Sequence, residues 1–186
     1  HVGAIAPGDD VLVLGAGAIG LLAAFAAMQA GAQVTVSARH RHQAAAARAL
    51  GAARVVDATS DVITRHAASA PPDIVVETVG GTAETLDLAL RVVRPGGRIV
   101  ALGKFTQPIT LPPLRFLMKE VQLASSMTYC RQGPRPDFAT ALALLAEHPC
   151  LATLVTHTVA LADVARGFAL AADKASGALK VAVRAA

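Results

Sequence analysis

A glycine-rich loop between an apolar strand and an alanine-rich helix constrains this chain more than any other feature. The apolar run Val11–Leu14 leads directly into Gly15-Ala16-Gly17-Ala18-Ile19-Gly20, and the helical pattern 18–30 follows. In a G-x-G-x-x-G motif placed this way, the first glycine allows a tight turn, the second lets backbone approach a pyrophosphate, and the third lets helix and strand pack closely. The helix N-terminus then attracts the diphosphate. The motif predicts a dinucleotide site at Gly15, Gly17, Ala18, Ile19 and Gly20. The alternative is a turn that only brings helix and strand together.

Short β-branched runs alternate with longer alanine-rich stretches, which is typical of a parallel sheet covered by helices. The predicted strands cover residues 11–14, 33–37, 54–56, 73–79, 98–102 and 121–125. The predicted helices cover residues 18–30, 42–50, 61–69, 82–93 and 114–119. The rhythm changes near residue 130, and a helix (137–147), a strand (154–159), a helix (164–172) and a strand (179–183) follow. We therefore expect an α/β protein with a first domain at 1–130 and a second at 131–186.

The second predicted strand lacks the acidic residue that usually binds the adenosine ribose. This acid is expected about 20 residues after the glycine loop, yet no Asp or Glu occurs between Val11 and Val56. The strand instead ends in Ser37-Ala38-Arg39-His40-Arg41-His42, and an arginine guanidinium offers a charged, planar fork to phosphate oxygens. We therefore predict NADP(H) in preference to NAD(H), with a 2′-phosphate at Ser37, Arg39 and Arg41. The alternative is a solvated loop and helix start, which we favour for the two histidines.

Two further loops are expected at the same edge of the sheet. Thr78, Val79, Gly80 and Gly81 follow the fourth predicted strand. The fifth predicted strand leads into Leu102-Gly103-Lys104. Ligands of an open parallel sheet bind outside the carboxyl ends of its strands, and glycine allows the backbone to approach a flat ring. Both loops are therefore predicted to line the nicotinamide half of the site, although ordinary strand-ending glycines remain the alternative.

Composition and charge argue against two other classes of partner. Lys and Arg number 17 and Asp and Glu 13, for a net charge of +4, while aromatic residues make up only 3%. So few aromatic side chains cannot form the stacking platforms that bind bases, and we therefore expect no nucleic acid partner. Residues 11–38 lack charge, but their glycines and their change from strand-like to helical period argue against a membrane span. The two cysteines form no Cys-x-x-Cys pair, and we expect a reduced, cytoplasmic protein.

No catalytic or metal-binding constellation is evident. A catalytic zinc needs about three protein ligands and an open position, and Cys130, His148, Cys150 and His157 show no such pattern. No Ser-His-acid arrangement emerges either. We therefore assign no catalytic residue and no metal ligand within this chain.

Several segments, taken in order, resemble the medium-chain, zinc-type alcohol and polyol dehydrogenases. They cover essentially the whole chain: Val11–Ala24, Ala49–Ala52, Asp73–Glu77, Leu90–Gly97 and Ser176–Val181. The resemblance implies a Rossmann-type, doubly wound, parallel six-stranded sheet with helices on both faces. It also implies a C-terminal return segment that, in the family, completes the GroES-like substrate domain. The family's preceding domain, which supplies the zinc ligands and much of the proton relay, has no counterpart here, so the chain resembles a fragment.

The resemblance also implies roles for individual residues. The glycine loop would lie under the pyrophosphate, with Ala18 in place of a proline that many members have. Lys180 corresponds to a basic residue near the cofactor phosphates. Arginine is frequent in polyol dehydrogenases at the position of Thr128, and a glycine common one strand earlier is replaced by Ser125, so a polyol substrate is not indicated. The nicotinamide lining would consist of Thr78, Val79, Leu102, Gly103, Ser126 and Met127.

The function that the resemblance implies is hydride transfer between an alcohol and an aldehyde or ketone. This chain would bind the NADP(H), and zinc is expected only in the missing domain, so the chain alone should be inactive. Two alternatives stay open: a non-catalytic, NAD(P)-binding regulatory module and a zinc-free quinone or enoyl reductase. Family members commonly dimerise through the edge of the sixth strand. The apolar stretch 111–118 before that strand is compatible with a homodimer.

Overall fold

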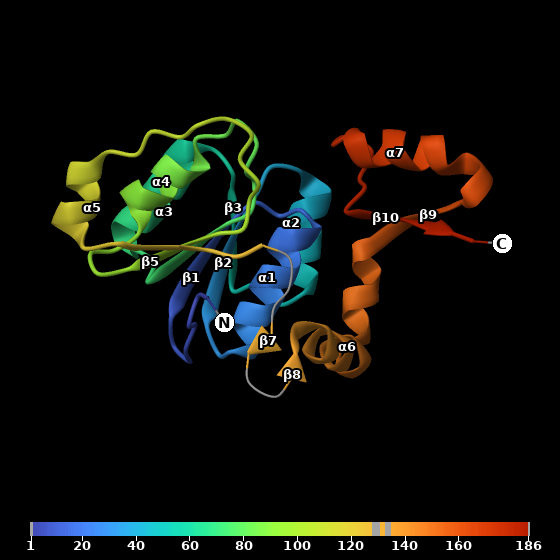
Figure 1. Ribbon diagram of the computed structural model, residues 1–186, viewed down its shortest axis with the longest axis horizontal. Helices are drawn as coiled ribbons and strands as arrows, with labels where there is room; N and C mark the ends of the chain where they lie inside the picture. Colours follow the sequence, from blue (N-terminus) through green and yellow to red (C-terminus); the bar gives the residue numbers. More distant parts are fainter. Residues whose placement is uncertain (1, 128–130, 133–134, 186) are drawn as a thin grey trace. The chain divides into compact units, whose positions relative to one another are not determined.

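The computed structural model describes residues 2–127, 131–132 and 135–185. The chain divides into two compact units, His1–Cys130 and Arg131–Ala186, which Figure 1 colours from blue to yellow and from orange to red. The first unit contains a six-stranded sheet, and the second contains one parallel and one antiparallel pair of strands.

The first unit is built on a parallel sheet with the strand order β3-β2-β1-β4-β5-β6. The chain runs outward from β1 to β3 and then crosses back to place β4 beside β1, so the strand order reverses between β1 and β4. The predicted doubly wound, six-stranded α/β fold is therefore confirmed. The strands are β1 (Asp10–Leu14), β2 (Gln33–Ala38), β3 (Arg54–Asp57), β4 (Ile74–Glu77), β5 (Arg98–Ala101) and β6 (Gln122–Ser125).

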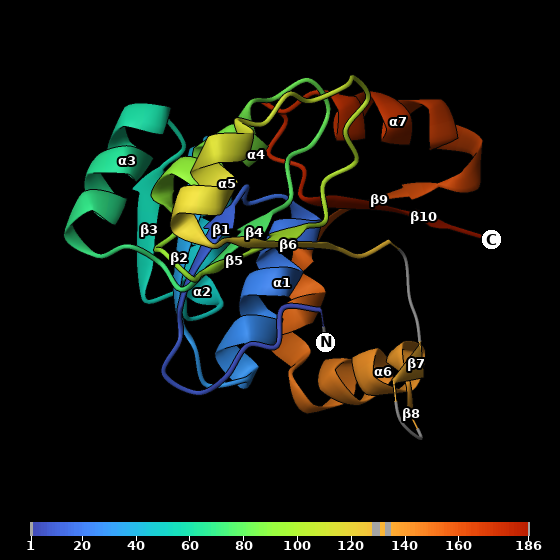
Figure 2. The same ribbon diagram turned by 60° about the vertical axis from the view of Figure 1, so that its left-hand side comes forward.

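Helices cover both faces of this sheet. In Figures 1 and 2, α1 and α2 lie on one face, and α3, α4 and α5 lie on the other. Two glycines with positive φ, Gly31 at +87° and Gly51 at +96°, follow α1 and α2 and redirect the chain toward the next strand. Side chains with a Cβ rarely adopt this conformation. The helices are α1 (Ala18–Gln29), α2 (Arg41–Ala49), α3 (Ser60–Ser69), α4 (Thr85–Val92) and α5 (Pro113–Lys119).

The core of the first unit consists of aliphatic side chains. Leu12 and Leu14 of β1 pack with Ile63 of α3 and Leu90 of α4 in one buried cluster. Successive side chains of a strand point to opposite faces of the sheet. Val11 and Val13 therefore point to the face that α1 covers. Burial on both faces explains why the central strands β1 and β4 contain continuous apolar runs rather than alternating ones.

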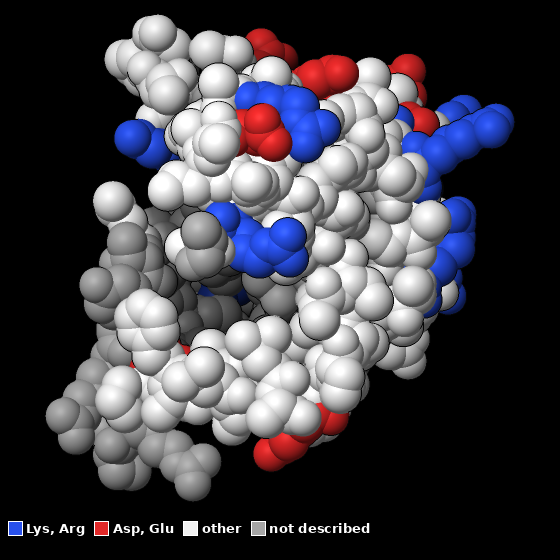
Figure 3. All heavy atoms as spheres, turned by 90° about the vertical axis from the view of Figure 1, so that its right-hand side faces the viewer, with Lys and Arg blue, Asp and Glu red and all other residues white. Residues whose placement is uncertain are grey.

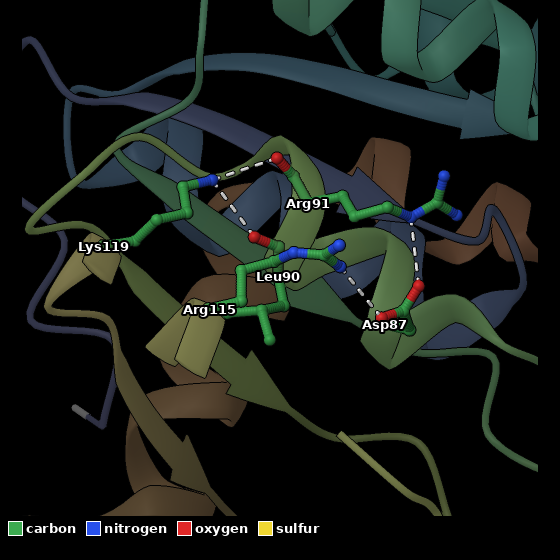
Figure 4. Close-up of polar contacts among 5 residues, drawn as sticks. All are labelled: Asp87, Leu90, Arg91, Arg115 and Lys119. Carbon is green, nitrogen blue, oxygen red and sulfur yellow. Dashed lines mark hydrogen bonds and ion pairs between the residues drawn. The ribbon is translucent and has the colours of Figure 1, made fainter. Parts of the chain in front are cut away.

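Polar contacts attach α5 to α4 (Figure 4). The Lys119 ammonium donates hydrogen bonds to the carbonyl oxygens of Leu90, at 3.1 Å, and Arg91, at 3.0 Å. The Arg115 guanidinium lies 3.2 Å from Asp87 Oδ1. Burial, and then the charge of Arg115, lower the pKa of Lys119 below its usual value. These bonds hold α5 in place beside the sixth strand.

The second unit contains two parallel strands, β9 (Val155–Ala160) and β10 (Lys180–Arg184), joined through α7 (Val164–Ala172). It also contains α6 (Asp137–Glu147) and 3₁₀ turns at Pro149–Leu154 and Leu161–Asp163. Large apolar side chains on α6 and α7 are exposed, namely Phe138, Leu142, Leu145 and Phe168. Figure 3 shows one face of the molecule, on which uncharged side chains predominate and Lys, Arg, Asp and Glu are scattered.

The structure differs most from the sequence expectation around residues 77–85 and 131–136. The fourth strand ends at Glu77 instead of residue 79, and the next helix begins at Thr85 instead of residue 82. Gly80 and Gly81 have φ of +60° and +66°, so the chain turns there and enters the helix later. The short antiparallel pair β7 (Arg131–Gln132) and β8 (Arg135–Pro136) was not expected, because two residues are too few to show a strand period.

Candidate functional site

The loop Gly15–Gly20 joins β1 to α1, and its shape depends on its first and last glycines. Gly15 has a φ of +102°, and a Cβ on it would lie 2.8 Å from Thr78 Oγ1 and 2.9 Å from Val79 Cγ2. A Cβ on Gly20 would lie 1.9 Å from the carbonyl oxygen of Gly15. Non-bonded atoms do not approach this closely, so only glycine lets α1 begin directly against the end of β1.

Gly17, the N-cap of α1, has open space beside it. Apart from its two chain neighbours, no atom of the described residues would lie within 4 Å of a Cβ there. Within the described part of the chain no side chain caps this helix, and its first turn contains no acidic residue. As at any helix N-terminus, its first N–H groups have no partner within the helix. Such groups, together with the positive end of the helix dipole, bind anions. The loop fits the diphosphate of a dinucleotide, with Ala18 and Ile19 in the first turn of the helix.

Ser37 supports the loop from the neighbouring strand. Its side chain in β2 is only 2% exposed, and its Oγ accepts a hydrogen bond from the backbone N–H of Gly15 at 3.1 Å. The hydroxyl therefore holds the first turn of the loop.

Basic side chains follow the end of β2. Arg39 and Arg41 are exposed, and neither guanidinium lies within ion-pair distance of a carboxylate among the described residues. The rings of His40 and His42 stack with centroids 5.5 Å apart. Burial, and then the neighbouring His40, lower the pKa of His42. Gln43 Oε1 accepts the backbone N–H groups of Arg39 and His40, both at 3.2 Å, so this turn is ordered while its arginine side chains are free to bind an anion.

The end of β4 contacts the glycine loop directly. Thr78 Oγ1 donates a hydrogen bond to the carbonyl oxygen of Leu14 at 2.8 Å, and the Thr78 N–H donates to the same oxygen at 3.0 Å. Val79 is 50% exposed although it is apolar, and its Cγ2 borders the position that a Gly15 side chain would occupy. Thr78 and Val79 therefore form one wall beside the glycine loop.

A fully buried carboxylate, Glu77, lies beneath this wall. Its Oε1 accepts hydrogen bonds from the N–H groups of Val79, at 2.7 Å, and Gly80, at 3.0 Å, and from Thr85 Oγ1, at 2.7 Å. Its backbone oxygen accepts the N–H groups of Leu102 and Gly103 at 2.8 and 3.0 Å. Our sequence reasoning did not select Glu77 as a site residue. The sequence signal that could have indicated Glu77 is an acidic residue at the end of an otherwise apolar strand.

The loop after β5 packs against the loop after β4. A Cβ on Gly80 would lie 2.6 Å from the backbone nitrogen and oxygen of Lys104, and a Cβ on Gly103 would lie 2.5 Å from the nitrogen of Gly80. The N–H of Gly81 donates to the Lys104 carbonyl oxygen at 2.8 Å. The contact between these loops therefore requires a glycine in each loop. Leu102 is the residue that connects β5 to the second loop.

The remaining predicted residues follow other strands. The Ser126 N–H donates to the carbonyl oxygen of Ala101 at 3.3 Å, which places it just after β6. Met127 is 83% exposed. Lys180 belongs to the second unit, where it begins β10. Thr128 and Cys130 lie outside the described residues.

All of the predicted residues of the first unit follow strands of one parallel sheet. They therefore gather at its carboxyl edge, and the loops after β1 and β4 flank the point where the strand order reverses. Open parallel sheets bind ligands in the crevice at such a point. The sheet thus brings together the glycine loop, the basic turn and the walls expected around a flat ring.

A metal centre does not fit the described part of the chain. In residues 2–127, 131–132 and 135–185, no three His, Cys, Asp or Glu side chains come together as metal ligands. Cys150 is an exposed free thiol. Separately, the helices of the described segments are all too short or too polar to cross a membrane.

Comparison with known proteins identifies the class. Residues 18–147 match the family model of zinc-binding dehydrogenases, and the chain belongs to this family. The match begins at the first turn of α1, directly after the glycine that caps it.

Individual relatives agree with this class. L-arabinitol 4-dehydrogenase from Aspergillus oryzae is 28% identical over 94% of this chain and 49% of its own length. An alcohol dehydrogenase from Thermus sp. ATN1 has a TM-score of 0.80 and 32% identity over 96% of this chain and 52% of its own. A protein described as a zinc-binding dehydrogenase from Sinorhizobium meliloti 1021, bound to NADP, has a TM-score of 0.82 and 26% identity over 97% of this chain and 54% of its own. The chain thus spans about half the length of these relatives.

Proposed function

We propose that this chain is the nicotinamide-cofactor-binding part of a zinc-dependent alcohol dehydrogenase. The observation that carries the proposal is the open N-terminus of α1, beside Gly17, at the reversal point of the sheet. It is supported by the relatives, which include an NADP-bound dehydrogenase and an alcohol dehydrogenase. Residues 1–130 would form the cofactor domain, and residues 131–186 would form the return segment.

The residues present suggest how the cofactor is held. The diphosphate would bind the N–H groups of the Gly15–Gly20 loop, including Gly17, Ala18 and Ile19. The nicotinamide ring would lie between the loop after β4 and the loops after β5 and β6, with Lys180 near the phosphates. When bound, the ring accepts or donates a hydride, and the protein fixes its position and surroundings. The nicotinamide lining would consist of Thr78, Val79, Gly80, Leu102, Gly103, Lys104, Ser126 and Met127.

We also propose that NADP(H) binds more tightly than NAD(H). No acidic residue is present at the end of β2, where a ribose-binding acid is expected. The exposed guanidinium groups of Arg39 and Arg41 follow directly, without a carboxylate partner among the described residues. A 2′-phosphate would gain charge-assisted hydrogen bonds from them. Ser37 would contribute by fixing Gly15.

Zinc and substrate would be held by a part of the protein outside this sequence. The relatives are about twice as long as the region that matches, and the described residues do not gather metal ligands. The second unit is also incomplete as a sheet, since its parallel pair β9–β10 leaves much of both strands exposed. Parallel strands are normally buried on both faces. We propose that a substrate domain completes this unit, that the substrate is an alcohol, aldehyde or ketone, and that the enzyme acts in the cytoplasm.

A homodimer is part of the same proposal. β6 is an edge strand, because β5 is its one pairing partner among the described strands, and an open edge invites pairing with another chain. Beside it, α5 exposes Leu114, Leu117 and Met118. Light scattering at high concentration should give the mass of two chains. A monomer mass would overturn this part of the proposal.

A titration of the 186-residue chain with NADPH and, separately, with NADH tests the cofactor assignment. Calorimetry or nicotinamide fluorescence should show binding of both, with NADPH the tighter ligand. Tighter binding of NADH would overturn the NADP(H) preference alone. Binding of neither cofactor by the folded chain would overturn the proposed function.

A further inference from the structure

Glu77 is a titratable residue that the proposed function leaves without a role. Its side chain is completely buried at the end of β4, among apolar strand residues. Its Oε2 has no hydrogen-bond partner among the described residues and is shielded from solvent. Burial of a carboxylate costs free energy unless hydrogen bonds or ion pairs compensate. The presence of one here, with one oxygen unpartnered, requires an explanation.

The contacts of Glu77 join the two loops that we expect around the nicotinamide. Its side-chain Oε1 holds the loop after β4 through the N–H groups of Val79 and Gly80. Its backbone oxygen holds the loop after β5 through Leu102 and Gly103. One residue therefore fixes both loops, each through two hydrogen bonds.

Steric contacts fix the spacing of the loops as well. A Cβ on Gly103 would lie only 2.3 Å from Glu77 Oε2. The carboxylate therefore fills the space beneath Gly103, and its second oxygen serves as a packing surface instead of a bonding group. Removal of the carboxylate would both free Val79 and Gly80 and leave a gap below Gly103.

The bonds of Glu77 point away from the adenosine half of the site. Among the described residues, Gly17 and Arg39, which would contact the diphosphate and the 2′-phosphate, donate no hydrogen bond to it. Among the described residues, the Glu77 side chain hydrogen-bonds to the loop after β4 and to Thr85 at the start of α4, and it packs beneath Gly103 in the loop after β5. A change at Glu77 should therefore affect one half of a bound dinucleotide.

We propose that Glu77 is a positioning residue for the nicotinamide half of the cofactor. It holds Val79 and Gly80 against Gly103 at the spacing that a flat ring requires. This inference rests on the proposed function, because it assumes a nicotinamide dinucleotide at the carboxyl edge.

The test compares NADPH with 2′-phospho-ADP-ribose, which lacks the nicotinamide. Glu77→Leu removes both oxygens, whereas Glu77→Gln keeps one acceptor and the same shape. Glu77→Leu should weaken NADPH binding about tenfold, as expected for unpaired buried donors, and change 2′-phospho-ADP-ribose binding less than about twofold. Glu77→Gln should restore NADPH binding to within about threefold of the unsubstituted chain.

Two further variants keep the test decisive. Glu84→Leu is the matched control, since Glu84 is exposed seven residues further along the chain, and it should change neither affinity. If Glu77→Leu does not fold by circular dichroism, Thr85→Val removes one donor to Oε1. It should still weaken NADPH about threefold without weakening 2′-phospho-ADP-ribose.

The possible outcomes separate the inference from the proposed function. Failure of the unsubstituted chain to bind either ligand would overturn the proposed function and the inference with it. If that chain binds both ligands, two results overturn the inference alone. One is an equal loss of affinity for the two ligands in the folded variants, and the other is no loss of affinity in any variant. It is also overturned if Glu77→Gln is as defective as Glu77→Leu, or if the unsubstituted chain binds both ligands equally well.

Discussion

The backbone N–H of Gly15 donates a hydrogen bond to the buried Oγ of Ser37, 3.1 Å away on the adjacent strand. This bond joins the turn after β1 to the end of β2. An acidic residue often occupies the end of this strand in dinucleotide-binding sheets. Here a serine hydroxyl fixes the loop, and the arginines beyond it remain available to an anion.

Ser37→Ala should destabilise the fold and loosen the loop. The Gly15 N–H would lose its acceptor in a partly buried setting, which costs about 1 kcal/mol in free energy of unfolding. Urea denaturation measures this loss. Ser69→Ala is the control. Ser69 Oγ also takes part in a hydrogen bond with the backbone, as a donor to the His66 carbonyl oxygen on an exposed surface, so the effect of its loss should be smaller. Equal effects of the two substitutions would contradict a special role for the Gly15–Ser37 bond.

Arg39→Asp should separate the two cofactors. The substitution replaces a cation beyond β2 with an anion, which repels a 2′-phosphate and can accept a hydrogen bond from a 2′-hydroxyl. We expect NADPH binding to fall at least about tenfold and NADH binding to change less than about threefold. Calorimetric titration of both cofactors measures the split.

Arg48→Asp is the control for this experiment. Arg48 is exposed in the last turn of α2, the helix that begins two residues after Arg39. Its replacement by Asp changes the net charge by the same amount. It should alter NADPH binding only slightly. Equal losses of NADPH and NADH in Arg39→Asp would show that the 2′-phosphate assignment is wrong.

The sequence predicted the central strands well because β1, β2 and β4 are largely buried runs, and it predicted the ends of α1 and α2 because a glycine follows each of them. Gly31 and Gly51 have the positive φ that their positions after α1 and α2 imply. The start of α4 was misplaced because a glycine pair does not reveal how many residues its turn uses. Glu77 was missed because its role depends on bonds to Gly80 and Thr85, and an isolated acid carries no spacing pattern.

Asp73 makes the stability of the sheet depend on pH. Its carboxylate accepts hydrogen bonds from Arg94 Nε, at 2.5 Å, and from the Asp10 N–H, at 2.8 Å. The Arg94 bond is the main reason that the pKa of Asp73 lies below its ordinary value of 3.8. A depressed carboxyl pKa stabilises the fold above pH 3.8, and this contribution is lost as the pH falls through the folded-state pKa.

Asp73→Asn measures this contribution. It should lower the free energy of unfolding at pH 7 by about 1 kcal/mol, because a charge-assisted bond at a partly exposed site is replaced by a neutral one. The difference from the unsubstituted chain should shrink below about pH 4. In the background of Arg94→Gln, Asp73→Asn should have a smaller effect at pH 7. A difference that is constant from pH 7 to pH 3 would contradict the linkage.

Gly17→Ala and Gly20→Ala should separate ligand binding from folding within one loop. A Cβ on Gly20 would meet the Gly15 carbonyl oxygen at 1.9 Å, so the alanine must push α1 away from β1 at a cost of at least about 3 kcal/mol. A Cβ on Gly17 meets nothing within 4 Å, so Gly17→Ala should unfold at nearly the same urea concentration as the unsubstituted chain. Its methyl group would occupy the space that a diphosphate needs, so NADPH binding should fall at least about tenfold. Full NADPH affinity in Gly17→Ala would show that the diphosphate binds elsewhere. Of the three glycines in the loop, Gly17 is the one at which an added methyl group would compete with a ligand and not with the described protein atoms.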